Sequence, residues 1–284
     1  MSATILELLA MFLTTYLGQV VAYFSVVGLV FLVTRRWAAA RLARRRIHTR
    51  GRRFDDAQLR HEIRHSFVVL AVGTAQLLAI TTLEARGLLR FSEGLGPWGW
   101  PGAAAALFAL ILFNDLWFYG FHRLLHTRWM YQRVHFVHHR SVDVNPFSSY
   151  SFHLIEALLI TGWIVPAALL VPLPMPVLMA AQVIGSLNNV MAHLGHELLP
   201  SWWIRAPLLR WSNTATFHAL HHERFKGNYG LFTRIWDRLF GTELDGYELA
   251  FADAHQAADP PESTPMHEQR RAGPQRSSAP TGPA

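Results

Sequence analysis

The sequence contains no cysteine, and only 16% of its 284 residues are charged. The missing thiols exclude disulfides, thiolate metal ligands, cysteine-ligated iron–sulfur clusters and a cysteine nucleophile within this chain. A soluble globular domain has about a quarter of its residues charged, so this chain is depleted in charge. Any metal ion would need nitrogen and oxygen ligands, and sixteen histidines are present to supply nitrogen.

Long apolar runs replace the missing charge. The first run, Ile5–Val33, has one acidic residue, Glu7, and exceeds the ~20 residues that span a bilayer. It lacks the basic start and short core of a cleaved signal peptide, so we expect a retained span. The other apolar runs are Ser66–Leu83, Pro101–Phe121, Leu154–Val171 and Met175–Ala192. The last two are joined by a proline-rich turn at 172–176, which predicts a helical hairpin.

Positive charge is concentrated directly after the first apolar run. Eleven of the arginines lie there, and they are Arg35, Arg36, Arg41, Arg44, Arg45, Arg46, Arg50, Arg52, Arg53, Arg60 and Arg64. This placement is the positive-inside signal of a cytosolic loop, and it favours membrane topology over nucleic-acid binding as the source of the net charge of +7. The segment 84–100 has only two arginines, so we expect it on the outer side. With this orientation every histidine cluster lies on the cytosolic face.

These patterns predict an all-α polytopic membrane protein with about three spans plus a helical hairpin, and a cytosolic, histidine-rich helical cap. We divide it into N-terminal spans with the arginine-rich loop (1–100), a histidine-rich domain (101–250) and a tail (251–284). The arginine-rich loop is expected to be solvated, with some helix. The tail is rich in Pro, Ala and Ser, which predicts disorder, so its histidines, His255 and His267, are not counted as ligands.

Three histidine boxes carry the chemistry. The first is His122-Arg-Leu-Leu-His126, and residues four apart share one face of a helix. The second and third repeat the pattern HxxHH. Adjacent histidines diverge by about 100° around a helix axis, so one helical turn can supply ligands to two metal ions. The histidines of the second and third boxes are His135, His138, His139, His218, His221 and His222.

Several residues flank the boxes at helical spacing. Asp115 shares a stripe with His122 and His126, either as an outer carboxylate that accepts a ligand's N–H or as part of a solvated helix end. Glu156 follows His153 by three residues, as an outer pair or an interfacial cap. Asn189 and His193 share another stripe. The ninth ligand is therefore expected to be His193, with Asn189 beside it and His196 as a less favoured substitute.

Eight or nine histidines are too many for one ion, because a structural zinc takes four ligands and a catalytic zinc three. Two metal ions with four or five nitrogens each account for the number. Imidazole alone does not select iron, since zinc, copper and nickel also bind it. Redox chemistry on an apolar substrate would explain why the site lies at a membrane, and this favours iron.

Residues 101–245 resemble the fatty acid hydroxylase/sterol desaturase superfamily of membrane non-haem di-iron enzymes. The resemblance is carried by the segment from Asp115 to His126, by His135–His139 with the following Arg140-Ser141, and by two closing motifs. Those motifs are Asn228-Tyr229-Gly230 and the segment Trp236–Thr242. The spacing of His193 and His196, three apart, departs from members that have two ligands four apart.

The resemblance implies two iron ions held by the nine histidines, and O₂-dependent hydroxylation, desaturation or ether cleavage of a lipid or sterol-like substrate. Electrons would come from a separate donor such as cytochrome b5, a ferredoxin or a flavin reductase, because no flavin, haem or iron–sulfur motif is evident. Two alternatives are a histidine-rich membrane metal transporter or metal-binding protein, and metal-assisted hydrolysis. A transporter would need ionisable residues within several spans, and the apolar runs are nearly free of them.

Overall fold

The structure is a computed structural model, and it describes residues 5–47, 54–96 and 98–256. Within these ranges, four helices are long and apolar enough to cross a bilayer. They are Ile5–Trp37, Asp56–Ala85, Gly99–Leu125 and Met175–Ala192. The predicted all-α polytopic architecture is therefore confirmed, and the second arm of the expected hairpin is itself one of the four.

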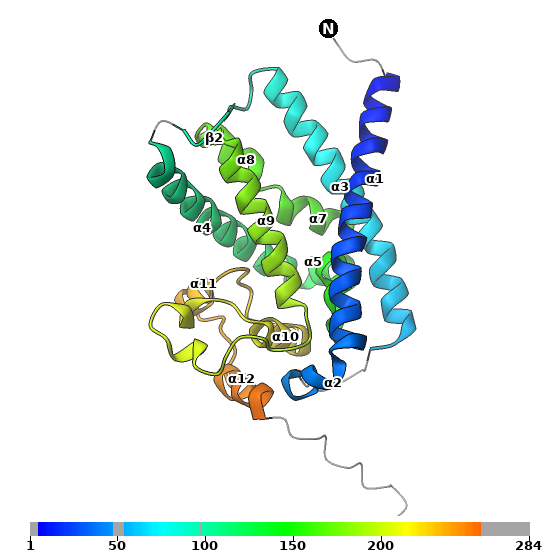
Figure 1. The fold of residues 1–284 in the computed structure, drawn as a ribbon, viewed down its shortest axis with the longest axis vertical. Helices are drawn as coiled ribbons and strands as arrows, with labels where there is room; N and C mark the ends of the chain where they lie inside the picture. Colours follow the sequence, from blue (N-terminus) through cyan, green and yellow to red (C-terminus); the bar gives the residue numbers. More distant parts are fainter. Residues whose placement is uncertain (1–4, 48–53, 97, 257–284) are drawn as a thin grey trace, which may run out of the picture.

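The N-terminal helices form an antiparallel pair. Helix α1 (Ile5–Leu32) continues as a π-helical turn, η1 (Val33–Trp37), and packs against α3 (Asp56–Ala85) (Figure 1). The chain between α1 and α3 forms α2 (Ala39–Leu42) and the 3₁₀ turn η2 (Ala43–Arg45). Helix α3 starts ten residues before the predicted apolar run, because Asp55 accepts a hydrogen bond from the N–H of Gln58 and caps the helix.

Part of the arginine-rich segment is helical, as expected, but one face of this helix, at Gln58 and Glu62, is buried rather than solvated. Glu62 of α3 is fully buried, and its carboxylate accepts hydrogen bonds from Gln58 Nε2 (2.8 Å), Asn145 Nδ2 (2.7 Å) and Ser148 Oγ (2.8 Å). Asn145 and Ser148 belong to the turn just after the second histidine box. Glu62 thus ties the N-terminal helix pair to the histidine-rich domain.

Helices α4 (Gly99–Leu125) and α9 (Met175–Ala192) pack side by side. The first arm of the predicted hairpin is broken near Gly162 into α7 (Leu154–Thr161) and α8 (Ile164–Leu170). Two short strands, β1 (Phe91–Ser92) and β2 (Leu173–Pro174), pair in parallel. This pairing joins the segment 84–100, which the charge pattern predicts on the outer side, to the proline-rich turn of the predicted hairpin, so both lie at one end of the molecule.

Short helices gather at the opposite end, where α10, α11 and α12 lie far from β2 and from the start of α1 (Figure 1). They arise from the second and third histidine boxes and the segments around them, whereas the first box lies at the C-terminal end of α4. Their bounds are α5 (Arg128–Met130), η3 (Tyr131–His135), α6 (Phe136–His139), η4 (Pro146–Tyr150), η5 (Trp203–Arg205), η6 (Leu209–Trp211), α10 (Ala215–Arg224), α11 (Ile235–Leu239) and α12 (Tyr247–Gln256).

Helix α12 corrects the predicted boundary of the tail. Residues 251–256, assigned from composition to a disordered tail, are helical, and Phe251 is buried against Phe217 and Tyr247. Nε2 of His255 lies 2.8 Å from Leu199 O and its Nδ1 lies 2.7 Å from Phe251 O, both of which are hydrogen-bond acceptors. The rest of the expected tail, 257–284, lies outside the described residues. The folded domain therefore extends to residue 256, because the apolar side chain of Phe251 packs into it.

Candidate metal centre

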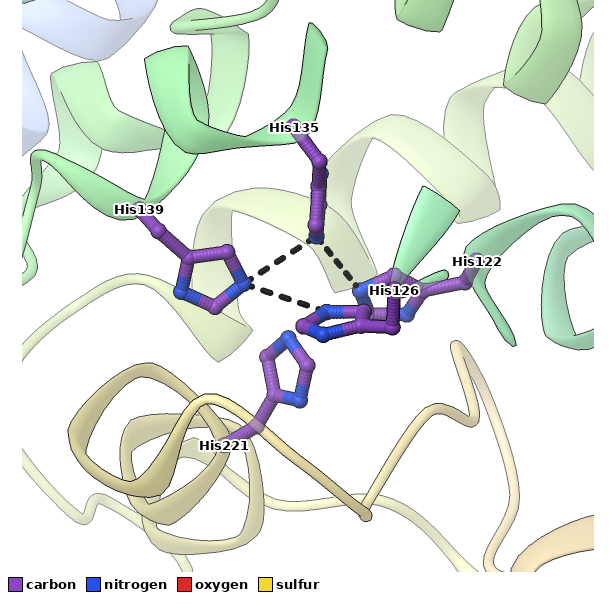
Figure 2. Close-up of side chains that lie close together, drawn as sticks. All are labelled: His122, His126, His135, His139 and His221. Atoms are coloured by element: carbon purple, nitrogen blue, oxygen red, sulfur yellow. Dashed lines mark hydrogen bonds between the residues drawn. The ribbon is translucent and has the colours of Figure 1, made fainter. Parts of the chain in front are cut away.

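The three boxes and His193 come together as two histidine groups in the described part of the chain. Every residue offers one ligand atom, and the ligand atoms of a group all lie within 4.8 Å of one another. The five-histidine group consists of His122, His126, His135, His139 and His221. The four-histidine group consists of His138, His193, His218 and His222. Figure 2 shows the five rings of the first group turned toward one another.

Helical spacing divides each HxxHH box between the two groups. In the second box, His135 and His139 are four residues apart and enter the five-histidine group, whereas His138 enters the other. The third box divides in the opposite sense. His218 and His222 enter the four-histidine group, and His221 enters the five-histidine group. The sequence-based expectation that one helical turn serves two sites agrees with this geometry.

Distances between ring nitrogens fit a shared cation in each group. Nε2 of His139 lies 3.1 Å from Nε2 of His135 and 3.2 Å from Nε2 of His126. Nε2 of His218 lies 2.9 Å from that of His193 and 3.1 Å from that of His222. Two nitrogens at right angles around an ion ~2.1 Å away would be about 3.0 Å apart. The donor sets therefore match metal binding.

A segment after the third box orients three rings of the five-histidine group. We call residues 225–229 the carbonyl segment. Its alternate carbonyl oxygens, of Phe225, Gly227 and Tyr229, lie 3.0, 2.7 and 2.9 Å from Nδ1 of three rings. The three rings belong to His126, His221 and His122, respectively. A carbonyl can only accept, so each Nδ1 carries the proton and each Nε2 lone pair is free for a metal.

The backbone of the carbonyl segment requires unusual conformations. Gly227 has φ +70°, and a Cβ there would lie 2.5 Å from Thr242 O. Phe225 and Asn228 are left-handed without being glycine, at φ 58° and 54°. Such residues cost energy and persist only where surrounding contacts enforce them. Asn228 provides one such contact, because its Nδ2 donates to Phe217 O at 3.0 Å.

Two aspartates hold the end of the carbonyl segment and the loop that follows it. Asp237 accepts from the N–H groups of Tyr229 and Gly230, each at 2.8 Å. Asp115 is fully buried and accepts from Phe232 N (2.7 Å), Thr233 Oγ1 (2.6 Å) and Trp236 Nε1 (3.0 Å). Asp115 was expected either to accept from a ligand histidine or to be solvated. Neither expectation is met, because Asp115 instead anchors the loop that continues the carbonyl segment.

The carboxylate of Glu156 does contact a histidine of the site. Its Oε1 lies 2.7 Å from Nδ1 of His135, and both residues are buried. A carboxylate in this position fixes the ring and raises its basicity as a ligand. His153 is not part of this contact, since its Nδ1 accepts from Ile155 N and caps α7.

The four-histidine group has fewer such contacts. His193 Nδ1 lies 2.7 Å from the main-chain oxygen of Asn189, and the Asn189 amide donates to Ser149 O (2.7 Å). Within the described residues, Nδ1 of His138 and Nδ1 of His222 are buried without a hydrogen-bond partner. His196 lies outside both groups, and its Nδ1 lies 3.0 Å from Leu194 O.

Burial keeps these imidazoles neutral. Removal from water disfavours the charged ring, and it lowers the pKa of His193 to about 4. The same cause lowers the pKa of His126, His135, His138, His139, His218, His221 and His222. Neutral imidazole is the form that binds metal, so the site is electrostatically ready for cations.

A narrow cavity, which we call the inner cavity, lies against both groups. Its walls include the apolar side chains of Phe118, Phe152 and Ile160. Three rings of the four-histidine group line it, but only two of the five-histidine group. These rings are His138, His193, His218, His122 and His135. A substrate in this cavity would lie closest to the four-histidine group.

Sequence reasoning missed the residues that act through the main chain. The carbonyl oxygens of 225–229 have no side-chain signature, although Asn228-Tyr229-Gly230 was recognised as a motif. Glycine is required at Gly230, where a Cβ would lie 2.1 Å from Thr233 O. Glu62 also had no signal, because it lies within a segment expected to be solvated.

Fold and site together define a polytopic helical membrane protein with a paired histidine centre. Residues 107–242 match the family model described as fatty acid hydroxylase. Human lathosterol oxidase is 30% identical over 189 residues, covering 65% of this chain and 61% of that protein. The Delta(7)-sterol 5(6)-desaturase ERG3B of Gibberella zeae is 26% identical over 216 residues, covering 76% and 61%.

A rice (Oryza sativa subsp. japonica) protein, very-long-chain aldehyde decarbonylase GL1-7, is 33% identical over 141 residues, covering 44% of this chain and 21% of its own length. The chain thus spans about three fifths of the sterol-oxidising relatives. No solved structure matches it. Residues 107–242 are a fatty acid hydroxylase domain, and this domain belongs to the fatty acid hydroxylase/sterol desaturase superfamily. Together with the four apolar helices, these relatives support an integral membrane protein.

Proposed function

We propose that the chain is an O₂-dependent di-iron enzyme that hydroxylates or desaturates a lipid or sterol-like substrate. The observation that carries the proposal is the division of nine histidines into groups of five and four beside one apolar-walled cavity. Nitrogen-only donor sets suit iron, and the membrane gives an apolar substrate direct access. The histidine groups are proposed to face the cytosol, on the side of the arginine-rich segment.

The protein's own residues would prepare this site in three ways. The carbonyl segment and Glu156 orient rings whose lone pairs would bind the two irons. Phe118, Phe152 and Ile160 exclude water and hold the alkyl part of the substrate. When bound, the irons would supply the O₂ activation needed to remove hydrogen from an unactivated C–H bond.

An external protein would supply the electrons. Cytochrome b5, a ferredoxin or a flavin reductase would suit, and the net charge of +7 favours an acidic donor. The alternative of a metal transporter fits less well, because a transport site needs ligands reached from both sides of a bilayer. A hydrolytic zinc centre would be over-coordinated by four or five imidazoles.

The test is expression in a host of defined lipid content under ¹⁸O₂, with lipid mass analysis and metal analysis on the same membranes. We expect iron in the protein and either an ¹⁸O-labelled lipid, for hydroxylation, or a lipid that has lost two hydrogens, for desaturation. His138→Ala should abolish the product. His196→Ala is the matched control, because His196 is also buried but lies outside both groups.

Two results would contradict the proposal. One is protein that carries no iron after anaerobic iron loading. The other is product formation that continues unchanged in His138→Ala.

A further inference from the structure

A second cavity adjoins the inner cavity. This outer cavity, which has a volume of about 30 Å³ in this structure and would widen around a lipid, is lined on one side by α9, through Asn188 and Met191, and on the other by Leu198, Leu199 and Thr214. Both cavities have Ala192 and Asn213 in their walls. We call these two residues the neck, because a molecule moving from one cavity to the other would pass them.

The outer cavity lies at the end of a helix that is apolar enough to cross the bilayer. Leu187 and Met191, four residues apart on α9, are 53% and 45% exposed, and Leu198 is 46% exposed. Farther along the same segment, Leu208 is 85% exposed. Such a row of apolar side chains is unfavourable in water and favourable in lipid. The mouth of the outer cavity therefore faces the membrane.

Asn213 presents an unpaired acceptor at the neck. Its Nδ2 donates to Gly230 O (2.8 Å) and Leu231 O (3.0 Å). Both partners are carbonyls and can only accept, so the amide cannot be reversed and Oδ1 must point away from them. Across the described residues, Oδ1 of Asn213 is buried with no hydrogen-bond partner. A buried acceptor without a donor is unfavourable, so a ligand hydroxyl at this position would be stabilising.

We infer that the outer cavity is a lateral entrance for a membrane-dissolved lipid alcohol, and that Asn213 accepts a hydrogen bond from its hydroxyl. A lipid seated this way has its polar group at the neck. The carbon atoms next to the hydroxyl then lie in the inner cavity, between Phe118, Phe152 and Ile160 and beside the histidines. Asn213 is thus a specificity-determining residue, and it selects lipids that bear a hydroxyl near the reacting carbon.

This inference rests on the proposed function only for what happens in the inner cavity, because entry and hydroxyl recognition need no turnover. It is therefore tested by binding. The full-length protein is placed in phosphatidylcholine nanodiscs without reductant. The probe is a sterol with a diazirine on its ring system and a free hydroxyl, and the comparison probe is its methyl ether. After illumination, labelled residues are mapped by mass spectrometry.

We expect the hydroxyl probe to label the buried lining of the outer cavity, at Leu194 or Ala215, and an unlabelled sterol alcohol to compete. The ether should label these positions about three- to tenfold less, since it cannot donate to Oδ1. Equal labelling by both probes would mean that Oδ1 holds only a water molecule. Labelling confined to the lipid-facing residues of α9, such as Val183, would mean that there is no entrance here. Either outcome overturns the inference.

A pair of variants tests the neck itself. Ala192→Leu adds bulk to a buried residue between the cavities, and Val183→Leu changes a residue of the same helix that is 58% exposed. Ala192→Leu should reduce labelling inside the cavities at least tenfold with metal content unchanged, and Val183→Leu should leave it at the wild-type level. If Ala192→Leu does not fold, the two-probe comparison on the unmodified protein still tests whether the lipid enters the outer cavity and whether its hydroxyl is recognised. Absence of iron or product alongside the expected labelling would contradict the proposed function alone.

Discussion

The five-histidine and four-histidine groups are made from the same boxes, yet the protein supports them differently. In the five-histidine group, four of the rings have an acceptor at Nδ1. Three of these acceptors are main-chain carbonyls of the carbonyl segment, and the fourth is the carboxylate of Glu156. In the four-histidine group, the described contacts give His193 such an acceptor, whereas His138 and His222 have none.

The difference in Nδ1 acceptors indicates that the two histidine groups have different tasks. Rings whose orientation and tautomer are fixed in advance bind a metal with less loss of freedom, so the five-histidine group is built to hold an ion firmly. The four-histidine group has fewer ligands, looser support and three rings on the inner cavity. Its ion would have more coordination positions open to small reactants. The comparison therefore predicts two inequivalent ions. The ion of the five-histidine group would be bound more firmly, and the ion of the four-histidine group would be more accessible to reactants.

The largest expected effect comes from adjacent residues that serve different groups. His138→Ala leaves three histidines in its group, so we expect the metal content to fall from two ions per chain to one, and turnover to fall about 100-fold or more. His139→Ala leaves four histidines in the other group, so both ions should remain. Metal analysis and product formation on the two purified variants check this. Identical losses in both would remove the distinction between the groups.

Graded removal of metal should separate the groups without mutation. With increasing concentrations of a chelator, we expect the iron content to fall in two phases, with midpoints at least about tenfold apart. The first phase should leave one ion per chain. Metal analysis after rapid desalting measures both phases, and His139→Ala should bring the midpoints together. A single phase that releases both ions would show that the groups are equivalent.

A pair of glycine variants tests the carbonyl segment. Gly227 and Gly241 both have a left-handed φ, near +70° and +65°, so alanine is strained at either by about 1 kcal/mol. At Gly227 the new Cβ also meets Thr242 O, and the carbonyl that orients His221 must shift. Gly227→Ala should lower iron affinity at the five-histidine group about tenfold or more, as measured by competition with a chelator.

Gly241→Ala is the control, because a Cβ there meets nothing within 4 Å. It should lower the unfolding temperature slightly and leave iron affinity unchanged. Equal losses of affinity in the two glycine variants would show that general destabilisation, rather than the position of the carbonyl, controls the site.

The smallest effect is expected at Glu156. Glu156→Gln keeps the shape and an acceptor oxygen for His135 but removes the negative charge. We expect both ions to remain, with a decrease of about tenfold in iron affinity and a changed Mössbauer signal for the five-histidine ion only. Glu156→Leu, which has no acceptor, should be several times worse. If the glutamine and leucine variants behave alike, the contact with His135 does not tune the site.

Local spacing made the two groups predictable from the sequence. An i, i+4 pair and a residue between them diverge around any helix, so His135, His138 and His139 were bound to face two directions. Choosing His193 over His196 followed from the same rule, because His193 continues the stripe of Asn189. Arginine asymmetry likewise predicts that the segment 84–100 lies on the outer side, and this orientation stays a prediction.

Contacts between distant segments were not predictable in this way. Asp115 lies 117 residues from Phe232, and neither its burial nor its partners leave a trace in local composition. The carbonyl segment acts through main-chain atoms that every residue possesses. Helix α12 was missed because a few buried side chains, among them Phe251, outweigh the polar composition around them. Tertiary packing decided all three.

The most direct measurement of the paired centre is Mössbauer spectroscopy of protein loaded anaerobically with ⁵⁷Fe, combined with metal analysis. We expect two irons per chain and two signals of equal area, with one signal selectively lost in His138→Ala. One iron per chain in the wild-type protein, or two irons that give a single signal and disappear together, would contradict the division of the nine histidines into a five-ligand and a four-ligand site.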